Sequence, residues 1–374
     1  MMMSNSWSGG HVTPVLCAAV SHGSEQLIAT GAESGELTVW NHDGLPLSKL
    51  HVSSDDVTCV TFSPSVPTLL YASHGQTVSV LDGRNLKSAV TDVQDAGEDE
   101  INCLSVNKTG DTLAVADDSG AVRIVDLQLQ KVTRTLQKHT NICSSVMFRP
   151  HRPQSLVSAG LDMQVILWNL PKVRPLWSFS LTDTLQDNAP PQTAGQMFNP
   201  PLAHCVSVTS CGNVFACAAE DGCVHLLRVS GDSRLWKRGV FKAHSQGASQ
   251  AHFIGFLSHP YWLATGGNDG LVSLWDLSED AVVANERTHK QHVRAHNKRH
   301  KAREKTTSLK QQTKEEEADG ALSSSDTCGN IGPKLCLSHR EKVNWICPAV
   351  LKGKPSVLVT DQSCSPTVYS IEKL

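Results

Sequence analysis

The sequence lacks the features that define several broad classes of protein. It contains no run of about 18 apolar residues, the length that a transmembrane helix needs. The N-terminal stretch MMMSNSWSGG has no apolar core of a secretion signal. The net charge of −3 over 374 residues gives no reason to expect a general affinity for nucleic acid. We therefore predict that the chain neither enters a membrane nor is secreted.

Motifs for metal binding and catalysis are missing as well. There is no Cys-x-x-Cys pair, no Gly-x-Ser-x-Gly elbow, no phosphate-binding glycine loop and no HExxH helix. We predict a protein without cofactor, metal or enzymatic activity. Four of the 12 cysteines occupy the third position of a V/I/A-x-C strand opening, which predicts small core residues rather than ligands or disulfides: Cys17, Cys59, Cys103 and Cys205. Unpaired core thiols favour a reducing compartment, the cytoplasm or the nucleus.

One pattern recurs along the whole chain. Its best copy, ATGGNDGLVSLWDL at 264–277, reads as a strand, an Asn-Asp-Gly turn and a second strand. Weaker copies stand at 31–40, 74–82, 117–126, 159–169, 219–228 and 360–370. The first three spacings between copies are 41, 44 and 43 residues, within the ~40–45 typical of four-stranded propeller blades. The sequence therefore predicts an all-β fold, a seven-bladed β-propeller.

The later spacings of 59, 48 and 94 residues require insertions. Candidates are a Pro/Gln/Asn-rich stretch near 182–201 and a charged segment at 278–332, which we expect to be disordered because it has few apolar residues. We assign blades 1 to 6 to 1–277 and blade 7 to 333–374. The last repeat lacks a fourth strand, so we expect residues 4–8 to complete that blade and close the ring.

The repeats resemble the WD-repeat family over about 1–277 and 333–374. In that family a His before the first strand, a Ser or Thr in the second, an Asp in the next turn and a Trp in the third form a hydrogen-bonded tetrad. Two repeats carry the full set: His139, Ser158, Asp162 and Trp168, and His244, Thr265, Asp269 and Trp275. A Ser, a His and an Asp also suggest a hydrolase triad. We favour the structural tetrad, because the spacing recurs with a Trp partner both times.

The other repeats keep only parts of this set. The first keeps Gly10-His11, Thr30 and Trp40, but Ser34 stands where the Asp is expected. The repeat around 205–228 keeps only Asp221; His204 there aligns with Asn102, inside a strand. The repeats around 57–82 and 101–126 lack the tetrad altogether.

A second resemblance concerns the segment LDGR at 81–84. Some WD-repeat proteins are substrate receptors of cullin-4 ubiquitin ligases and carry Trp-Asp-x-Arg at the end of a repeat, where the Arg engages the propeller adaptor of the ligase. Leu81 replaces the Trp here, while Asp82 and Arg84 keep their places. The resemblance implies that Asp82 and Arg84 bind the adaptor. The alternative is an ordinary surface Arg in a loop between strands.

Two further features leave alternatives open. The segment 287–310 contains nine Lys/Arg and four His, which fits a nuclear-targeting or nucleic-acid-contacting patch, or a solvated loop. Its histidines, His289, His292, His296 and His300, are not expected to hold a metal. Glu33, Asp118 and Glu220 occupy equivalent turn positions and would form an acidic rim for a basic peptide, unless they are ordinary turn acids.

These features favour a non-enzymatic scaffold that recruits an unidentified protein substrate to a cullin-4 ligase adaptor. The alternative is a nuclear WD-repeat scaffold whose basic insertion contacts nucleic acid or acts as a targeting signal.

Overall fold

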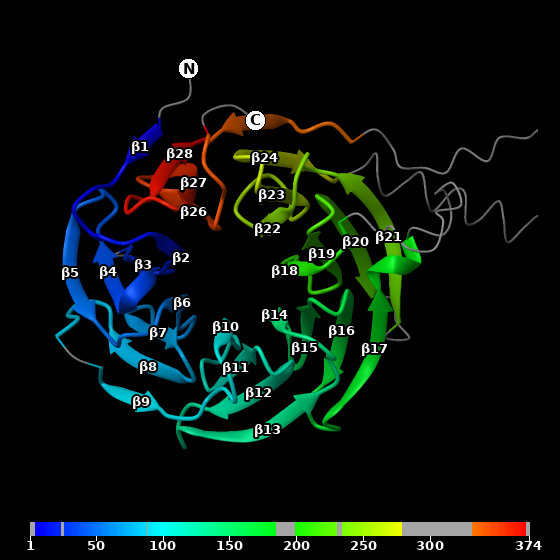
Figure 1. The fold of residues 1–374 in the computed structure, drawn as a ribbon, viewed down its shortest axis with the longest axis horizontal. Helices are drawn as coiled ribbons and strands as arrows, with labels where there is room; N and C mark the ends of the chain where they lie inside the picture. The colour runs from blue at the N-terminus through cyan, green and yellow to red at the C-terminus, as the bar shows by residue number, and fades with distance from the viewer. Residues whose placement is uncertain are drawn as a thin grey trace, which may run out of the picture.

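The computed structural model describes residues 4–23, 26–87, 89–184, 199–229, 234–278 and 331–371. These residues form seven four-stranded antiparallel sheets that stand as blades around a central axis (Figure 1). The predicted all-β, seven-bladed propeller is therefore confirmed. The only helical elements in the described part of the chain are two short 3-10 segments, η1 (Glu33–Gly35) and η2 (Leu181–Thr184). No helix among these residues is long and apolar enough to cross a membrane.

Blades 1 to 6 are each built from four strands in chain order, the first lining the axis and the fourth lying at the periphery (Figure 1). Blades 1 to 3 consist of β2 (Val15–Val20), β3 (Ile28–Ala32), β4 (Glu36–Trp40) and β5 (Pro46–His51); β6 (Val57–Phe62), β7 (Leu69–His74), β8 (Thr77–Asp82) and β9 (Thr91–Val93); and β10 (Ile101–Val106), β11 (Thr112–Asp117), β12 (Ala121–Asp126) and β13 (Lys131–Gln137).

Blades 4 to 6 follow the same plan. They consist of β14 (Cys143–Arg149), β15 (Arg152–Gly160), β16 (Gln164–Asn169) and β17 (Arg174–Ser180); β18 (Ala203–Val208), β19 (Val214–Ala219), β20 (Cys223–Val229) and β21 (Leu235–Lys242); and β22 (Ala248–Ile254), β23 (Trp262–Gly267), β24 (Leu271–Asp276) and β25 (Leu335–Ser338).

Blade 7 joins the two ends of the chain. It contains β26 (Trp345–Leu351), β27 (Lys354–Thr360), β28 (Thr367–Ser370) and, from the N-terminal side, β1 (Ser4–Ser6). Ser4 pairs with Tyr369 and Ser6 with Thr367 in an antiparallel register. This pairing closes the ring, because the outer strand of the last blade comes from the other end of the sequence.

One boundary in the sequence-based domain assignment needs correction. Residues 333–374 were all assigned to blade 7, but β25 pairs with β24 through Leu271 and Ser338 and completes blade 6. The charged segment thus separates the third and fourth strands of one blade rather than two blades. Disorder was predicted for residues 278–332, of which 279–330 lie outside the described residues, as do residues 185–198 of the Pro/Gln/Asn-rich stretch.

The core lies between neighbouring blades, where apolar side chains of adjacent sheets pack together. The interface of blades 4 and 5, for example, buries Leu167, Phe215 and Leu227 completely. The four phased cysteines are free and buried, as predicted, with at most 8% exposure. Three of their thiols also donate to a carbonyl of the next blade: Cys17 to Val57 (3.3 Å), Cys103 to Val146 (3.5 Å) and Cys205 to Ala251 (3.5 Å).

Candidate functional site

The blade 4 tetrad links the loop before β14 to the turn after β15. His139 Nδ1 lies 2.9 Å from Asp162 Oδ1, and Nε2 lies 2.8 Å from Ser158 Oγ. The indole N–H of Trp168 donates to the same hydroxyl at 2.8 Å. Ser158 is completely buried. Its hydroxyl oxygen is therefore hydrogen-bonded to two side chains of the same blade and is not accessible to a substrate. The four residues act as a structural hydrogen-bond network, and Ser158 is not a nucleophile.

Blade 6 repeats this geometry with a threonine. His244 lies 2.9 Å from both Asp269 Oδ1 and Thr265 Oγ1, and Trp275 donates to Thr265 at 2.9 Å. The ring of His244 packs directly on the end of β23, where a Cβ added at Gly267 would come within 2.4 Å of the imidazole. Glycine at this position lets the histidine reach the hydroxyl.

Blade 1 completes its tetrad with a residue that sequence reasoning missed. His11 Nε2 lies 2.6 Å from Thr30 Oγ1, and Trp40 donates to that hydroxyl at 2.7 Å. The nearby carboxylate belongs to Glu36, 3.4 Å from His11 Nδ1, and not to the turn position of Ser34. Glu36 also accepts the backbone N–H of Val12 at 2.9 Å. Burial lowers the pKa of His11 to about 4, although Glu36 partly opposes this shift.

Blade 7 has a related group that the sequence reading also missed. His339, in the loop between β25 and β26, lies 2.8 Å from the hydroxyl of Tyr369 through Nδ1 and 2.7 Å from Asp361 Oδ2 through Nε2. Tyr369 stands where blade 4 has Trp168, and its longer reach replaces the missing hydroxyl residue of the second strand. A histidine before the first strand and an acid after the second were the available signals.

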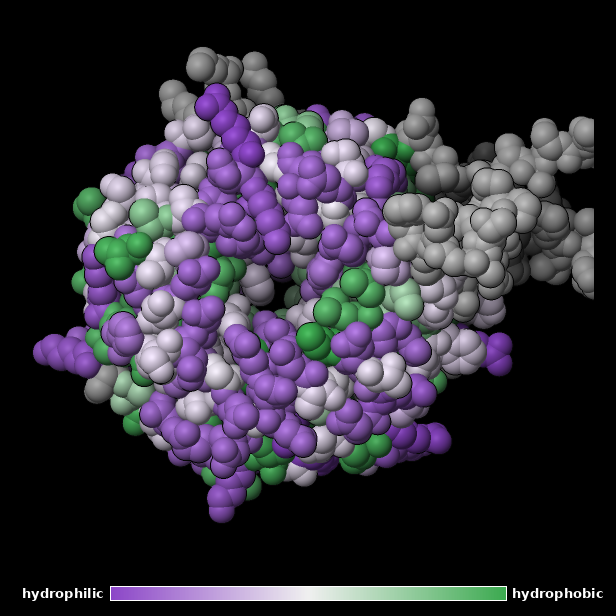
Figure 2. Space-filling view, viewed as in Figure 1, coloured by the Kyte–Doolittle hydropathy of each residue, from purple (hydrophilic) through white to green (hydrophobic). Residues whose placement is uncertain are grey.

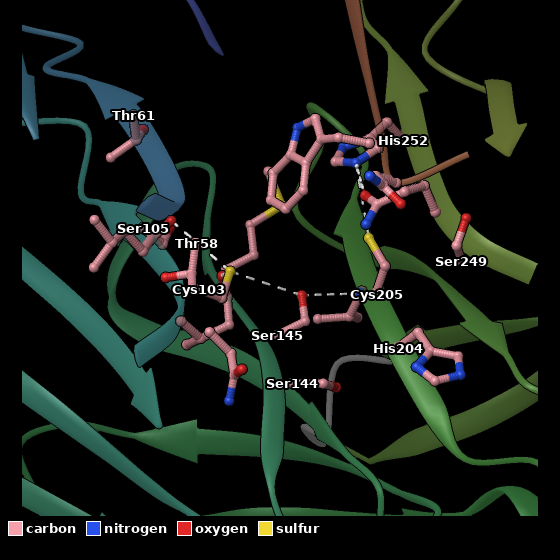
Figure 3. Close-up of a pocket in the computed structure, with 18 of the residues that line it drawn as sticks. Thr58, Thr61, Cys103, Ser105, Ser144, Ser145, His204, Cys205, Ser249 and His252 are labelled. Carbon is pink, nitrogen blue, oxygen red and sulfur yellow. Dashed lines mark hydrogen bonds between the residues drawn. The ribbon is translucent and has the colours of Figure 1, made fainter. Parts of the chain in front are cut away.

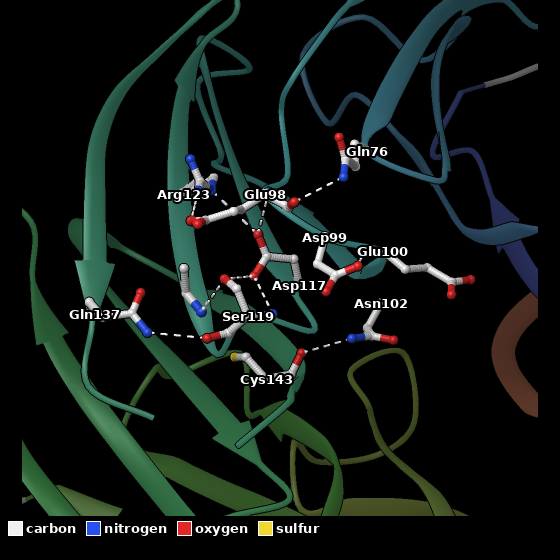
Figure 4. Close-up of polar contacts among 11 residues, drawn as sticks. Gln76, Glu98, Asp99, Glu100, Asn102, Asp117, Ser119, Arg123, Gln137 and Cys143 are labelled. Atoms are coloured by element: carbon white, nitrogen blue, oxygen red, sulfur yellow. Dashed lines mark hydrogen bonds and ion pairs between the residues drawn. The ribbon is translucent and has the colours of Figure 1, made fainter. Parts of the chain in front are cut away.

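Blade 3 fastens the same loop with a carboxylate network (Figure 4). Asp117 occupies the strand position that Gly160 has in blade 4. Asp117 pairs with Ile101, the first residue of β10, as Gly160 pairs with Cys143, the first residue of β14. Asp117 is fully buried and accepts the backbone N–H of Glu98 at 2.9 Å. The guanidinium of Arg123 pairs with both Asp117, at 3.3 Å, and Glu98.

The central channel holds a hollow of about 630 Å³, and first strands of the blades line it (Figure 3). Hydrophilic residues cover most of the face around its opening (Figure 2). At one mouth, side chains donate to a backbone carbonyl of the next blade and join the blades into a belt: Thr58 to Ile101, Asn102 to Cys143 (3.3 Å), Ser144 to Ala203 (2.6 Å), Ser249 to Val343 (2.7 Å) and Asn344 to Val15 (3.2 Å).

The belt is interrupted at blade 1, where the apolar Leu16 takes the equivalent strand position, and at blade 5. His204 takes the equivalent strand position but turns to Glu220, with Nε2 2.6 Å from Oε2. His204 is therefore a channel-mouth residue and not a tetrad histidine, in agreement with its alignment inside a strand. Both side chains remain about one-third exposed, 31% and 32%.

Deeper in the channel, Cys205 and His252 face each other (Figure 3), with Sγ 3.8 Å from Nε2. Burial raises the pKa of Cys205 to about 12 and lowers the pKa of His252 to about 4. The pair is therefore neutral near pH 7 and lacks the thiolate of a cysteine nucleophile. The described residues also contain no group of three or more His, Cys, Asp or Glu arranged to hold a metal.

The three acids predicted to form a rim lie in blades 1, 3 and 5. Asp118 accepts a hydrogen bond from Asn102 at 2.8 Å, and Glu220 contacts His204, so both are tied to the mouth of the channel. Glu33 lies in η1 and is half-buried.

A denser acidic surface lies between blades 2 and 3. A hollow of about 670 Å³ is lined there by Asp55, Asp56, Asp95, Asp99 and Glu100, among other residues. Burial raises the pKa of Glu100, and so do the neighbouring acids. The run DAGEDE at 95–100 was the sequence signal for this surface.

The predicted adaptor residues lie at the opposite rim, where β8 ends. The guanidinium of Arg84 donates two hydrogen bonds to the carboxylate of Asp82, from Nε to Oδ1 at 3.0 Å and from Nη2 to Oδ2 at 2.6 Å. This pairing lowers the pKa of Asp82. The side chain of Arg84 is still 61% exposed. Leu81, in place of the family's Trp, is fully buried in the core.

Two exposed apolar side chains lie on segments that are hydrogen-bonded to this loop. Leu47 of β5 is 53% exposed, and the loop after Arg84 is tied to that strand because Leu86 N donates to Ser48 Oγ at 3.2 Å. Val66 is 48% exposed in the β6–β7 loop, next to Thr68, whose carbonyl accepts Gly83 N at 2.7 Å. We refer to Leu47, Val66, Asp82 and Arg84 as the Arg84 edge.

Comparisons with known proteins agree with this architecture. The family model described as WD domain, G-beta repeat matches residues 130–169 and 236–276, the two regions that carry all four tetrad residues of the family pattern. WD repeat-containing protein 53 homolog of Dictyostelium discoideum is 25% identical over 97% of this chain and 93% of its own length.

Other relatives match shorter stretches. WD repeat-containing protein 37 of Homo sapiens is 23% identical over 40% of this chain and 31% of its own length. Retinoblastoma-binding-like protein E of Dictyostelium discoideum is 30% identical over 27% of this chain and 17% of its own length.

Proposed function

This chain is a WD-repeat propeller, and we propose that it links a protein substrate to the propeller adaptor of a cullin-4 ubiquitin ligase. The observation that carries the proposal is the Asp82–Arg84 pair. A bidentate carboxylate holds the guanidinium in one orientation, so little side-chain entropy remains to be lost when a partner binds. Arginine beside exposed apolar side chains is a common composition of interface hot spots.

The substrate would then bind at the channel mouth on the other face. Glu33, Asp118 and Glu220, together with the acidic hollow between blades 2 and 3, favour a lysine- or arginine-rich segment. We place this activity in the cytoplasm or the nucleus, where the free buried thiols stay reduced.

The test is a binding assay with the purified adaptor. Arg84→Ala is expected to weaken adaptor binding at least tenfold, because an interface arginine anchor contributes about 2 kcal/mol or more. Lys87→Ala is the matched control, since Lys87 is an exposed cation three residues away, and it should bind like wild type. Equal adaptor binding by wild type and Arg84→Ala would refute the assignment.

In the same assay, Asp99→Lys with Glu100→Lys should abolish capture of an oligolysine probe and leave adaptor binding unchanged. Capture of the probe by this variant would refute the acidic substrate site.

A further inference from the structure

Cys59 and Cys103 hold the same position in the first strands of two successive blades. Cys59 pairs with Ser73 and Cys103 pairs with Ala116, in each case directly after an irregularity in the strand register. The sulfur of Cys59 lies against blade 3, because Leu104 N donates to it at 3.3 Å. Two thiols that are 44 residues apart in the chain are thus brought together between β6 and β10.

The surroundings of Cys103 favour its thiolate. The pKa of Cys103 is lowered first by a hydrogen bond from the thiol of Cys59 and further by the hydroxyl of Ser145, whose Oγ lies 4.0 Å from the sulfur, although burial opposes this shift. The interaction with Cys103 raises the pKa of Cys59, and burial adds to the rise. Cys205 holds the same strand position in blade 5 but faces His252, and burial raises its pKa to about 12. The pair between blades 2 and 3 therefore combines a nucleophilic sulfur with a second thiol that keeps its proton.

Cys103 is also the member of the pair that a solute reaches. It lines the hollow of the central channel and is 8% exposed, whereas Cys59 is 2% exposed (Figure 3). The hollow of about 630 Å³ admits a small neutral oxidant such as hydrogen peroxide. A lowered pKa, access to solutes and a neighbouring second thiol are the features of a redox-sensing cysteine.

We propose that Cys59 and Cys103 form a site of reversible oxidation, at which a hydroperoxide converts the two thiols into a disulfide between blades 2 and 3. The thiolate of Cys103 attacks the peroxide, so an S–O bond forms, the O–O bond breaks, and the second oxygen takes up a proton and leaves as an alcohol or water. The sulfur of Cys59 then attacks the sulfenic acid, so the S–S bond forms, the S–O bond breaks and water leaves with the proton of Cys59. Two electrons pass from the two sulfurs to the peroxide, and a dithiol reductant reverses the change by exchange.

The disulfide would join the two strands that lead away from the acidic hollow. Asp56 and Glu100, which line that hollow, each stand three residues before the cysteine of their blade. The bond would therefore fix the spacing between the two walls of the hollow. This site is independent of the Arg84 edge and goes beyond the proposed ligase role.

The test is treatment of the folded full chain with hydrogen peroxide, followed by thiol alkylation, tryptic digestion without reduction and mass spectrometry. Trypsin releases Cys59 in peptide 50–84 and Cys103 in peptide 88–108, and neither peptide contains another cysteine. We expect the two peptides to be recovered as a disulfide-linked pair that dithiothreitol separates. The oxidised chain should unfold about 4 °C above the reduced chain, because the cross-link lowers the entropy of the unfolded state.

Single substitutions assign the two roles. In Cys59→Ser the sulfenic acid of Cys103 has no second thiol to attack it, so dimedone should trap about tenfold more of it than in wild type. In Cys103→Ser the thiol of Cys59 should stay reduced, and peroxide should leave the unfolding temperature unchanged. Cys205→Ser is the matched control, since it removes a channel thiol at the same strand position, and it should form the linked pair like wild type.

Two outcomes would overturn the proposal. The first is recovery of peptides 50–84 and 88–108 unlinked after peroxide treatment, whether as alkylated thiols or with Cys103 oxidised to a sulfinic acid. The second is linkage of peptide 50–84 to peptide 1–49, which contains Cys17, in place of peptide 88–108. Cooperative thermal unfolding of the reduced variants verifies that they are folded.

Discussion

Blades 4 and 3 fasten the same loop to the same turn by opposite means. In blade 4 the loop supplies His139 and the strand end supplies Gly160, so the imidazole fits over the backbone. In blade 3 the strand end supplies the large polar side chain, Asp117, and the loop contributes a backbone N–H. The fold thus requires a buried polar link between loop and turn, while the residues that make it are exchangeable. A tetrad that looks lost in the sequence has, in this blade, been replaced.

The largest loss of stability is expected when the aspartate of blade 3 is introduced into blade 4 while His139 and Asp162 are kept. Gly160→Asp would put a Cβ 2.8 Å from His139 Nδ1 and 2.8 Å from the carbonyl of Ile142. We expect a loss of about 4 kcal/mol in unfolding free energy, from overpacking and an uncompensated buried charge. Urea unfolding measures this loss.

The combined variant His139→Gly, Gly160→Asp and Asp162→Ser sharpens the comparison. It copies Gly97, Asp117 and Ser119 of blade 3 and removes the clash with the imidazole and the like charge of Asp162, while the close approach to the carbonyl of Ile142 remains. It should be more stable than Gly160→Asp alone. A triple variant that is as unstable as the single one would show that the two arrangements are not exchangeable.

A smaller effect is expected at the hydroxyl position. Ser158→Ala leaves the imidazole of His139 and the indole N–H of Trp168 without their shared partner, at a cost of about 2–3 kcal/mol. Cys217 holds the equivalent register position in blade 5, which has no tetrad histidine, and Cys217→Ala should cost about 1 kcal/mol. Chemical denaturation of both variants makes the comparison. Equal losses would mean that the tetrad hydrogen bonds add nothing beyond packing.

A further effect concerns the pH dependence of stability and distinguishes blade 1. The pKa of His11 is about 4 in the folded state against an ordinary value of 6.5, so the unfolded chain binds the proton more readily. Stability is therefore full above about pH 6.5 and falls as the pH drops toward 4, by about 2 kcal/mol at pH 5 for this one group. His252, with the same pKa of about 4, adds to the decline.

The variant His11→Gln tests this contribution. It should be less stable at pH 7 but show a shallower decline between pH 6.5 and 5 in a series of thermal unfolding curves. His42→Gln, which alters a half-exposed histidine of the same blade, serves as the control and should leave the slope unchanged. An unaltered slope in His11→Gln would contradict the assignment.

The sequence predicted those features that depend on residues close together in the chain. Period-two alternation and the Asn-Asp-Gly turn around 268–270 predicted strands and turns, and the complete tetrads could be identified because all four members lie within about 30 residues in one blade. The phase of Cys17, Cys59, Cys103 and Cys205 predicted their burial for the same reason.

Residues that depart from the family pattern, or that meet only in the tertiary structure, were missed. Glu36 supplies the carboxylate of blade 1. The turn of η1 places the start of β4 so that Glu36 accepts the backbone N–H of Val12, which lies 24 residues earlier in the chain. Tyr369 and His339 have the sequence separation of a tetrad, but a Tyr stands where the family pattern has a Trp and the second strand offers no hydroxyl residue at the tetrad position. The acidic hollow also combines turns of two blades, which adjoin only after the ring has formed.

The sequence by itself determined the number of repeats, the all-β propeller and the two complete tetrads, because hydrophobic period and short-range hydrogen bonding are properties of neighbouring residues. Only the tertiary structure decided that β25 belongs to blade 6, since a strand's blade is set by the partner it pairs with and not by its position in the chain. It also decided which charges gather on which surface. Trp177 and Arg234 are 57 residues apart in sequence and meet because β17 and β21 stand side by side at the rim.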